Sequence, residues 1–361
     1  MTKASWASPQ SWDMTLFLSA LLLTLISGVE MMSAASTVNP ALATRHWVWI
    51  VIGVLASLGI SRTDYHRWSD LAWAAYGVSL LALLLVRVFG AMRLGATRWL
   101  SVFGVSLQPS EMAKFATVWL LARYLAGQPS PLRSRTLTGS LLIAGPPAVL
   151  IFIQPDLGSA TVLGAIWIGM IFVAGASRRS LLGLTACVIA VLPVAWHVLK
   201  SYQRDRLMAF IDPHADPLGA GYTIIQSIIA IGSGCLVGRG WFAGTQNQLS
   251  FLPERHSDFI FSIIGEEWGF VGCTVVVILF SVLLARTLRL ALTTPDPQGR
   301  LLAIGIFFWI GYQAFVNMGM VMGLLPVVGV PLPMVSYGGS SMVTVWLALG
   351  FLQAIRRSAM S

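Results

Sequence analysis

Asp258 is the residue whose sequence setting most favours chemistry. It stands where a polar segment, residues 250–257, meets a long apolar segment, and Glu254, Glu266 and Glu267 lie close by in the chain. A carboxylate at such a boundary can act as a general base, or it can cap the first turn of a helix. The residue pattern alone leaves both interpretations open.

Several arginines fall on segments that we expect on the same side of the protein as Asp258. They are Arg98 in an earlier connection and Arg204, Arg206, Arg239 and Arg255 in the segment before Asp258. Arginine is suited to bidentate binding of phosphate oxygens. One carboxylate beside a basic cluster therefore indicates a substrate that carries a phosphate or pyrophosphate group.

Other charged residues interrupt apolar segments, where ionisable groups are costly and are by default functional candidates. Glu111 and Lys114, in QPSEMAK, can pair along one helix face, and an acid soon after Pro109 also suits a helix start. Asp156, in QPDLG, suits a turn or a helix N-cap. Each of these three residues keeps a structural and a functional interpretation.

The remaining ionisable residues near Asp258 are expected to have supporting roles. Glu266 and Glu267 are adjacent, so on a helix they point about 100° apart and cannot both face one site. We expect at least one of them to be structural. His256 is two residues from Asp258 and would not face it on a regular helix, so we expect it to support the site.

Sequence motifs of several enzyme classes are missing. There is no HExxH, Walker or Gly-x-Ser-x-Gly sequence, and the three cysteines are too scattered for a disulfide framework or a cysteine metal site. The residue chemistry therefore predicts an enzyme or a carrier that acts on a lipid phosphate, without deciding between them.

The composition indicates whether these residues belong to a soluble protein or to a membrane protein. Hydrophobic residues make up 56% of the chain and charged residues 10%, with a mean hydropathy of +0.77, whereas soluble domains carry about 25% charged residues. The chain is therefore predicted to be an integral membrane protein, with no cleavable signal peptide evident. We attribute its net charge of +9 to membrane topology and not to nucleic-acid binding.

Ten apolar segments approach the length that crosses a bilayer. They are 14–35, 46–61, 71–91, 110–126, 137–154, 158–176, 180–199, 258–285, 300–323 and 336–355. We therefore expect an all-α polytopic membrane protein, with residues 1–361 forming one integral domain. Thirteen of the 23 Lys and Arg residues fall on the connections that lie on the same side of the membrane as the N-terminus. Because positive charge favours the cytoplasmic side, both termini are predicted to be cytoplasmic.

One long connection, about residues 200–257, joins the seventh and eighth segments on the extracytoplasmic side. It is rich in apolar residues, so we expect it to be ordered and functional. Residues 223–231 are expected to form a helix at the outer membrane surface. In this topology Asp258, Asp156 and the Glu111–Lys114 pair lie near the outer face, and no charged path crosses the midplane.

Long stretches along nearly the whole chain resemble the SEDS (shape, elongation, division and sporulation) family of bacterial membrane proteins. They include QPSEMAK (108–114), QPDLGSA (154–160), YQRDRLMAFIDPHADPLGAGY (202–222), GTQNQLSFLPERHSDFIFSIIGEEWGFVG (244–272) and LLPVVGVPLPMVSYGGSS (324–341). The fourth stretch and the short cytoplasmic tails resemble the elongation branch more than the division branch.

The resemblance implies a peptidoglycan glycosyltransferase of the bacterial cytoplasmic (inner) membrane. Such a protein polymerises lipid II on the extracytoplasmic side and releases undecaprenyl pyrophosphate. It works with a class B penicillin-binding protein, a transpeptidase, and with other membrane proteins of the rod complex. The family's essential aspartate falls on Asp258, its fourth-helix glutamate and lysine on Glu111 and Lys114, and its turn aspartate on Asp156.

The expected reaction is a single inverting displacement, because an α-linked pyrophosphate becomes a β-1,4 bond. That step needs one general base, for which we expect Asp258, and cations that neutralise the leaving group. The resemblance implies that Asp258, Glu111 and Lys114 are catalytic. The residues expected to bind substrate are Arg98, Gln108, Asp156, Arg204, Arg206, Arg255 and His256. No organic cofactor is expected. Whether Mg²⁺ or Mn²⁺ takes part is left open.

Three alternatives remain at this stage. The first is a transporter that flips lipid II without chemistry, which ten spans and buried charges would also suit. The second is a scaffold that only holds the transpeptidase. The third is a division-type member of the same family.

Overall fold

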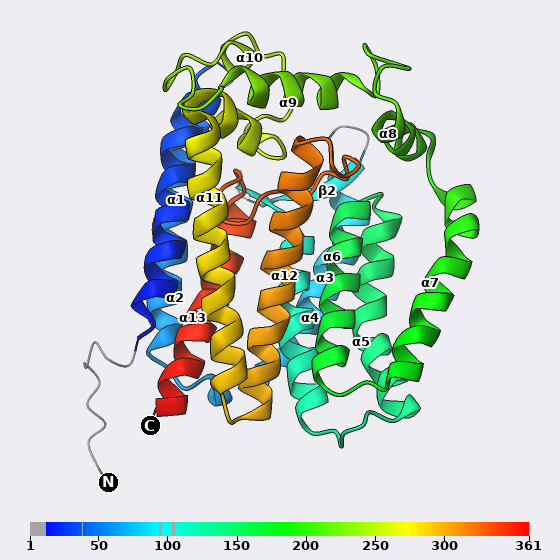
Figure 1. Ribbon diagram of the computed structural model, residues 1–361. Helices are drawn as coiled ribbons and strands as arrows, with labels where there is room; N and C mark the ends of the chain where they lie inside the picture. The colour runs from blue at the N-terminus through cyan, green and yellow to red at the C-terminus, as the bar shows by residue number, and fades with distance from the viewer. Residues whose placement is uncertain (1–11, 38, 94–95, 103–104, 361) are drawn as a thin grey trace.

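The computed structural model of the protein describes residues 12–37, 39–93, 96–102 and 105–360, and it is mostly helical (Figure 1). Each of the ten apolar segments falls on a long helix. These helices are α1 (Met14–Ala34), α2 (Ala41–Ser61), α3 (Leu71–Phe89), α4 (Pro109–Ala126), α5 (Ser134–Ile153), α6 (Leu157–Val173), α7 (Arg178–Val198), α11 (Ile260–Thr293), α12 (Pro297–Val321) and α13 (Gly339–Met360). A short 3₁₀ helix, η2 (Tyr65–Trp68), precedes α3.

Six of these helices, α1, α2, α3, α5, α11 and α12, are long and apolar enough to cross a membrane. The prediction of a helical polytopic membrane protein is therefore confirmed. The first described helix begins at the same end of the bundle at which α13 ends (Figure 1). The opposite end carries the segment between α7 and α11.

That segment is folded, as its apolar composition predicted. It contains α8 (Ser201–Ile211), α9 (Tyr222–Ser233) and the single-turn α10 (Thr245–Gln248). Helix α9 coincides with the helix expected over residues 223–231 and lies across the end of the bundle (Figure 1). Its buried residues, Ile224, Ser227 and Ala230, follow the three-residue spacing of one helix face.

A small sheet departs from the all-α expectation. Strands β1 (Ala91–Arg93), β2 (Ala96–Val102) and β3 (Val105–Leu107) form an antiparallel sheet in the order β1-β2-β3. Leu100 pairs with Leu107, so the sheet brings Arg98 beside the start of α4. Strands β1 and β3 have only three residues each, too few to give a clear alternating pattern, and the sequence analysis did not predict the sheet.

Helix α12 is the helix around which the site is built. It packs against α11, α4 and α6 and is buried along most of its length (Figure 1). Trp309, Gln313 and Asn317 are spaced four residues apart, so they lie on one face of α12. All three are buried, and their polar groups point toward α4 and the segment before α13.

Helix α11 is interrupted at Gly269, where φ is 67° and ψ is −160°. A Cβ atom at this position would lie 2.3 Å from the Gly238 backbone nitrogen, so only glycine fits. The amides of Phe270 and Val271 donate to carbonyls of Cys235 and Leu236. The loop before α10 therefore satisfies the backbone groups that the break leaves without helical partners.

Candidate active site

Asp258 lies in the turn directly before α11 and is half-buried. Helix α11 begins two residues later, and its N-cap, Phe259, makes no side-chain capping bond. Among the described residues, the Asp258 carboxylate accepts no hydrogen bond, whereas its backbone carbonyl accepts one from Asn317 Nδ2 at 2.9 Å. The capping interpretation is therefore wrong for Asp258, and its carboxylate is left available for a ligand.

Gly329 separates this carboxylate from an arginine. A Cβ atom built on Gly329 would lie 3.4 Å from Asp258 Oδ2 and 3.7 Å from Arg206 Nη1. The residue has a φ of +71°, which favours glycine on its own. The backbone conformation therefore favours glycine at this position, and a methyl group there would touch both charged groups at ordinary contact distance.

Arg206 and Arg98 meet in a shallow groove, which we call the arginine groove. It is lined by Arg98, Pro155, Leu157, Tyr202, Gln203, Arg206, Leu207, Val327 and Val328. Tyr202 anchors α8 to this groove, because its hydroxyl donates to Pro155 O at 3.1 Å and Arg206 lies over its ring. The groove thus presents two cations next to the segment that carries Gly329.

Asp156 is buried next to Arg98 and does not itself line the groove. It is the N-cap of α6, accepting from Ser159 N at 3.1 Å, and Arg98 Nη1 is 3.9 Å from its Oδ1. Arg98 also donates to the carbonyls of Gln154 and Pro155. The turn interpretation of Asp156 is therefore correct, and in the same position it orients Arg98.

Charges around Asp258 set its protonation. Burial and the negative charges of Glu254 and Asp156 raise the pKa of Asp258, Arg206 and Arg98 oppose the rise, and the net result is a pKa of about 6. A carboxylate with a pKa near 6 is ionised at neutral pH and more basic than an ordinary aspartate. These are the properties of a general base.

Glu111 and Lys114 form an ion pair inside the protein. Their charged atoms are 2.6 Å apart, and both side chains are completely buried in the first turns of α4. Ser341 Oγ donates to Glu111 at 3.1 Å, and Lys114 Nζ donates to Gln313 Oε1 at 3.0 Å. The pairing that the sequence spacing suggested is present, and the pair does not line the arginine groove.

The side-chain amides of Gln313 and Asn317, on α12, connect this ion pair to the region of Asp258. Gln313 Nε2 donates to Pro331 O at 2.9 Å, and Asn317 Nδ2 donates to Val330 O at 2.7 Å as well as to Asp258 O. The segment that carries Gly329 is therefore held between α12 and the base. Ser336 Oγ adds a further hydrogen bond between this segment and the turn before α11, donating to Ser257 O at 2.5 Å.

The other predicted substrate-binding residues lie elsewhere. Arg204 donates to His197 O at 2.9 Å, toward α7, and does not line the groove. Arg255 is 2% exposed, and its guanidinium donates to Ala34 O, Asn247 O and Thr37 Oγ1. Gln108 is the buried N-cap of α4, and its backbone N–H donates a hydrogen bond to Ser340 Oγ.

His256 contacts Tyr337 and Glu254 and does not line the arginine groove. Its ring centroid is 5.9 Å from that of Tyr337, and its Nε2 is 4.0 Å from Glu254 Oε2. Burial lowers the pKa of His256, with Glu254 opposing the effect. The residue therefore makes its contacts within the turn before Asp258 and with Tyr337, and its expected role at the site stays a prediction.

Glu266 and Glu267 are both structural, and they bind the same loop. Glu266 accepts from the amides of Gln246 and Asn247, and Glu267 accepts from Ser33 Oγ, Phe242 N and Asn247 Nδ2. The expectation that they could not share a site is wrong, because the loop of residues 242–247 wraps around both. Arg239 lies on this loop, bonded to Ser233 O and Thr245 Oγ1, and not beside Asp258.

Metal-binding side chains are not grouped in the described part of the chain. No three His, Cys, Asp or Glu residues there are arranged to hold an ion. The protein side chains described here therefore do not fit a resident Mg²⁺ or Mn²⁺ site, and no step below depends on one.

Comparisons with known proteins identify the family. A family model described as "Cell cycle protein", for FtsW, RodA and SpoVE, matches residues 9–361. The chain belongs to this family. The peptidoglycan glycosyltransferase MrdB of Escherichia coli (strain K12) is 38% identical over 344 residues, covering 95% of this chain and 93% of MrdB. The probable peptidoglycan glycosyltransferase FtsW of Geobacter metallireducens is 37% identical over 357 residues, covering 95% and 94%.

The FtsW/RodA/SpoVE fold is also found among solved structures. A chain in a peptidoglycan synthase complex, in which polymerization and crosslinking are coordinated, superposes with a TM-score of 0.84. It is 34% identical and covers 96% of this chain and 98% of that chain. The resemblance to the SEDS family is therefore confirmed.

The sequence analysis did not predict three residues of the site. Gly329 lies in an apolar connection without charges. Gln313 and Asn317 lie in a helix whose composition is that of an ordinary membrane-spanning helix. The spacing of the two amides, four residues apart, was the one signal that could have indicated a polar face on α12. The contact of Gly329 with Asp258 joins segments more than 70 residues apart, which local spacing cannot reveal.

Proposed function

We propose that this protein is a peptidoglycan glycosyltransferase that polymerises lipid II. The observation that carries the proposal is the Asp258 carboxylate, which accepts no hydrogen bond from the described residues and lies close to Arg206 at Gly329. A base next to a cation is what transfer to a hydroxyl with loss of pyrophosphate requires. Its relatives MrdB and FtsW are named as enzymes of this activity.

Topology supports the same activity. We propose ten membrane spans, both termini in the cytoplasm of a bacterial inner membrane, and the segment of α8–α10 on the extracytoplasmic side. Positive residues near the ends of the helices favour this orientation. The arginine groove then opens at the outer leaflet, where a lipid-linked disaccharide presents its pyrophosphate.

In the proposed mechanism, Asp258 removes the proton from the sugar 4-hydroxyl of lipid II. The hydroxyl oxygen attacks the anomeric carbon of the growing lipid-linked strand, and the bond to undecaprenyl pyrophosphate breaks with inversion. Arg206 and Arg98 stabilise the charge that develops on the leaving pyrophosphate. Asp156 orients Arg98, and Glu111 with Lys114 supports the segment beneath the groove through Gln313.

We assign Arg255, Arg204 and Gln108 no contact with the pyrophosphate in this mechanism. A divalent ion, Mg²⁺ or Mn²⁺, would need oxygen ligands from the substrate in addition to protein carboxylates. We further propose a class B penicillin-binding protein as partner, since the related chain of known structure belongs to a complex that coordinates polymerization and crosslinking. The sequence of residues 244–272 favours an elongation role.

The alternative from another class is a lipid II flippase. Buried charges support it, but the described ones stand near the two ends of the bundle, Asp13 with Arg286 at one end and Glu111 with Lys114 toward the other, instead of lining a path through it. Purified protein with lipid II in detergent separates the two functions, because detergent offers no leaflet to cross. Polymer on a gel supports the glycosyltransferase, and unchanged monomer supports the carrier.

A further inference from the structure

The side chain of Arg255 is buried three residues before Asp258 and makes no contact with the pyrophosphate in the mechanism above. Its Nε, Nη1 and Nη2 atoms each donate to a different acceptor, namely Ala34 O, Asn247 O and Thr37 Oγ1. In the described part of the chain no carboxylate lies within 4 Å of this guanidinium. All its hydrogen bonds therefore go to neutral oxygens on other segments of the protein.

Two of the three acceptors lie at the end of α1. Ala34 is the last residue of this helix, and the last carbonyls of an α-helix have no partner within the helix. A cation at that end also interacts favourably with the helix dipole. Thr37 follows in the connection to α2. Arg255 therefore fixes its own segment to the C-terminal end of α1.

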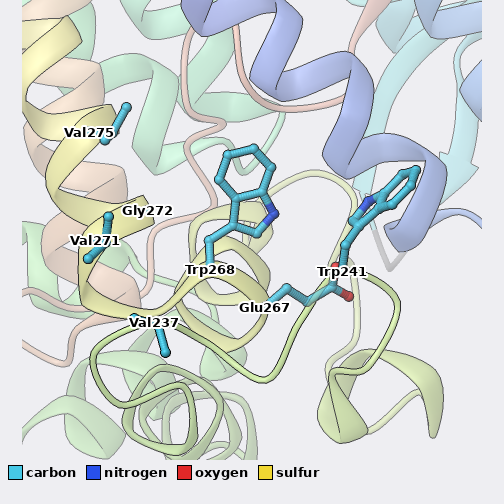
Figure 2. Close-up of a pocket in the computed structure, with 7 residues that line it drawn as sticks. All are labelled: Val237, Trp241, Glu267, Trp268, Val271, Gly272 and Val275. Atoms are coloured by element: carbon cyan, nitrogen blue, oxygen red, sulfur yellow. The ribbon is translucent and has the colours of Figure 1, made fainter.

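The third acceptor belongs to a loop that is itself held in place. Glu266 accepts from Asn247 N at 3.2 Å, and Glu267 accepts from Asn247 Nδ2 at 2.8 Å. Glu267 also accepts from Phe242 N at 3.1 Å, and in Figure 2 its side chain extends from α11 toward Trp241. The loop is therefore bound to the first turns of α11, and the Asn247 carbonyl is a fixed anchor for Arg255.

Arg255 belongs to the same tight turn as Asp258. The carbonyl of Glu254 accepts from the backbone N–H of Ser257 at 3.0 Å and from that of Asp258 at 3.1 Å. Glu254 itself has a φ of +48°, which reverses the direction of the chain at the start of the turn. Because these bonds close residues 254–258 into one unit, a displacement of Arg255 is passed on to Asp258.

Two groups of elements hold this turn. Asn317 on α12, with Ser336 and Tyr337 before α13, donates to the backbone carbonyls of residues 256–258. Arg255 supplies the bonds to α1 and α10. Helices α1 and α12 both pack against α11, which follows the turn directly, and they flank it in Figure 1. Without the bonds of Arg255, the turn would be held mainly from the side of α12.

We propose that Arg255 is a positioning residue for the catalytic base. It holds the turn against α1 and α10, so that the Asp258 carboxylate keeps its place close to Arg206 at Gly329. Arg255 touches neither substrate nor leaving group, and it acts through the geometry of the turn. This inference rests on the proposed glycosyl transfer with Asp258 as the base.

Polymerisation of lipid II in detergent by R255K, expressed per folded protein and measured with its Tm, tests the proposal. Lysine keeps the positive charge, but its single nitrogen cannot replace a planar fork that reaches three separate acceptors. We expect kcat to fall about ten-fold with little change in KM, because a small misplacement of a catalytic group lowers the rate strongly. The control is R286K, since Arg286 binds Asp13 at the other end of the bundle. It is expected to lower Tm and to keep the wild-type kcat.

Two further variants separate positioning from a purely structural role. T37V removes one acceptor of Arg255 at an exposed position and is expected to lower kcat about three-fold at an unchanged Tm. In R255K/N317L the loss of kcat is expected to be smaller than the product of the two single losses, because both residues hold one turn.

A wild-type kcat for R255K per folded molecule, or independent losses in the double variant, would overturn the proposal. If R255K does not fold, T37V decides, and a wild-type kcat for T37V would overturn it. Absence of polymer from the wild-type protein would overturn the proposed function together with this inference, whereas the other outcomes leave that function intact.

Discussion

Asp258 and the Glu266–Glu267 pair lie within ten residues of each other, yet the protein uses them in opposite ways. The two glutamates are buried and accept six hydrogen bonds from the loop around Asn247 and from Ser33. The Asp258 carboxylate is half-buried, accepts none among the described residues, and faces Arg206. Charge near a membrane helix therefore marks chemistry only where the protein leaves the carboxylate unsatisfied.

The largest effect is expected where a buried charge loses its partner. The variant K114M leaves Glu111 buried and unpaired, which typically costs about 3–5 kcal/mol. We expect a large fall in Tm together with loss of polymerisation. The double variant E111Q/K114M should recover part of the lost Tm, since it removes both charges. If K114M kept the wild-type Tm, Glu111 and Lys114 would not form the internal support described here.

Much of the fold could be predicted because the dominant signals are local. Runs of apolar residues located the long helices, and Pro109 and Asp156 located helix starts. Asp258 could be singled out because it stands at a boundary that local composition reveals. The small sheet and the break at Gly269 depend on contacts between distant segments, and short strands and single glycines carry no pattern of their own.

The site was less predictable than the fold for the same reason. Arg206 and Arg255 look alike in the sequence, but one lines the groove and the other donates to backbone carbonyls in the interior. Which arginine is free depends on where Ala34 and Asn247 fall after folding. No spacing rule encodes that contact.

Asn317 provides the next largest effect. The variant N317L removes the bonds to Asp258 O and Val330 O, and we expect kcat to fall about 100-fold with little change in KM. Its matched control is Q353L, because Gln353 is also buried and makes two bonds, both to the Asp13 backbone at the other end of the bundle. Each variant loses about 1–3 kcal/mol of stability. Equal activity of N317L and Q353L would show that the hydrogen bonds of Asn317 have only a structural role.

Gly329 tests the spacing between base and arginine. In G329A the added methyl group lies near both Asp258 and Arg206, and the backbone is strained by about 1–2 kcal/mol. We expect the polymerisation rate to fall about ten-fold. G164A serves as the control, because nothing lies within 4 Å of its added Cβ atom. A wild-type rate for G329A would indicate that substrate does not use this gap.

The smallest effect concerns pH. Because Asp258 must be ionised to accept a proton and its pKa is about 6, polymerisation should rise as the pH increases through that value. The variant E254Q removes a negative charge beside it and therefore lowers its pKa, so the acid limb of the pH–rate profile should move to lower pH. R206Q should move that limb to higher pH. Identical acid limbs in all three proteins would exclude Asp258 as the titrating base.

The most direct test compares D258N with E267Q for polymerisation of lipid II in detergent, each measured with its Tm. D258N is expected to keep the wild-type Tm and lose about 10²–10⁴-fold in rate. E267Q is expected to lose stability, because its carboxylate holds the loop, while its folded fraction still polymerises. A D258N protein that makes polymer at the wild-type rate would contradict the central assignment.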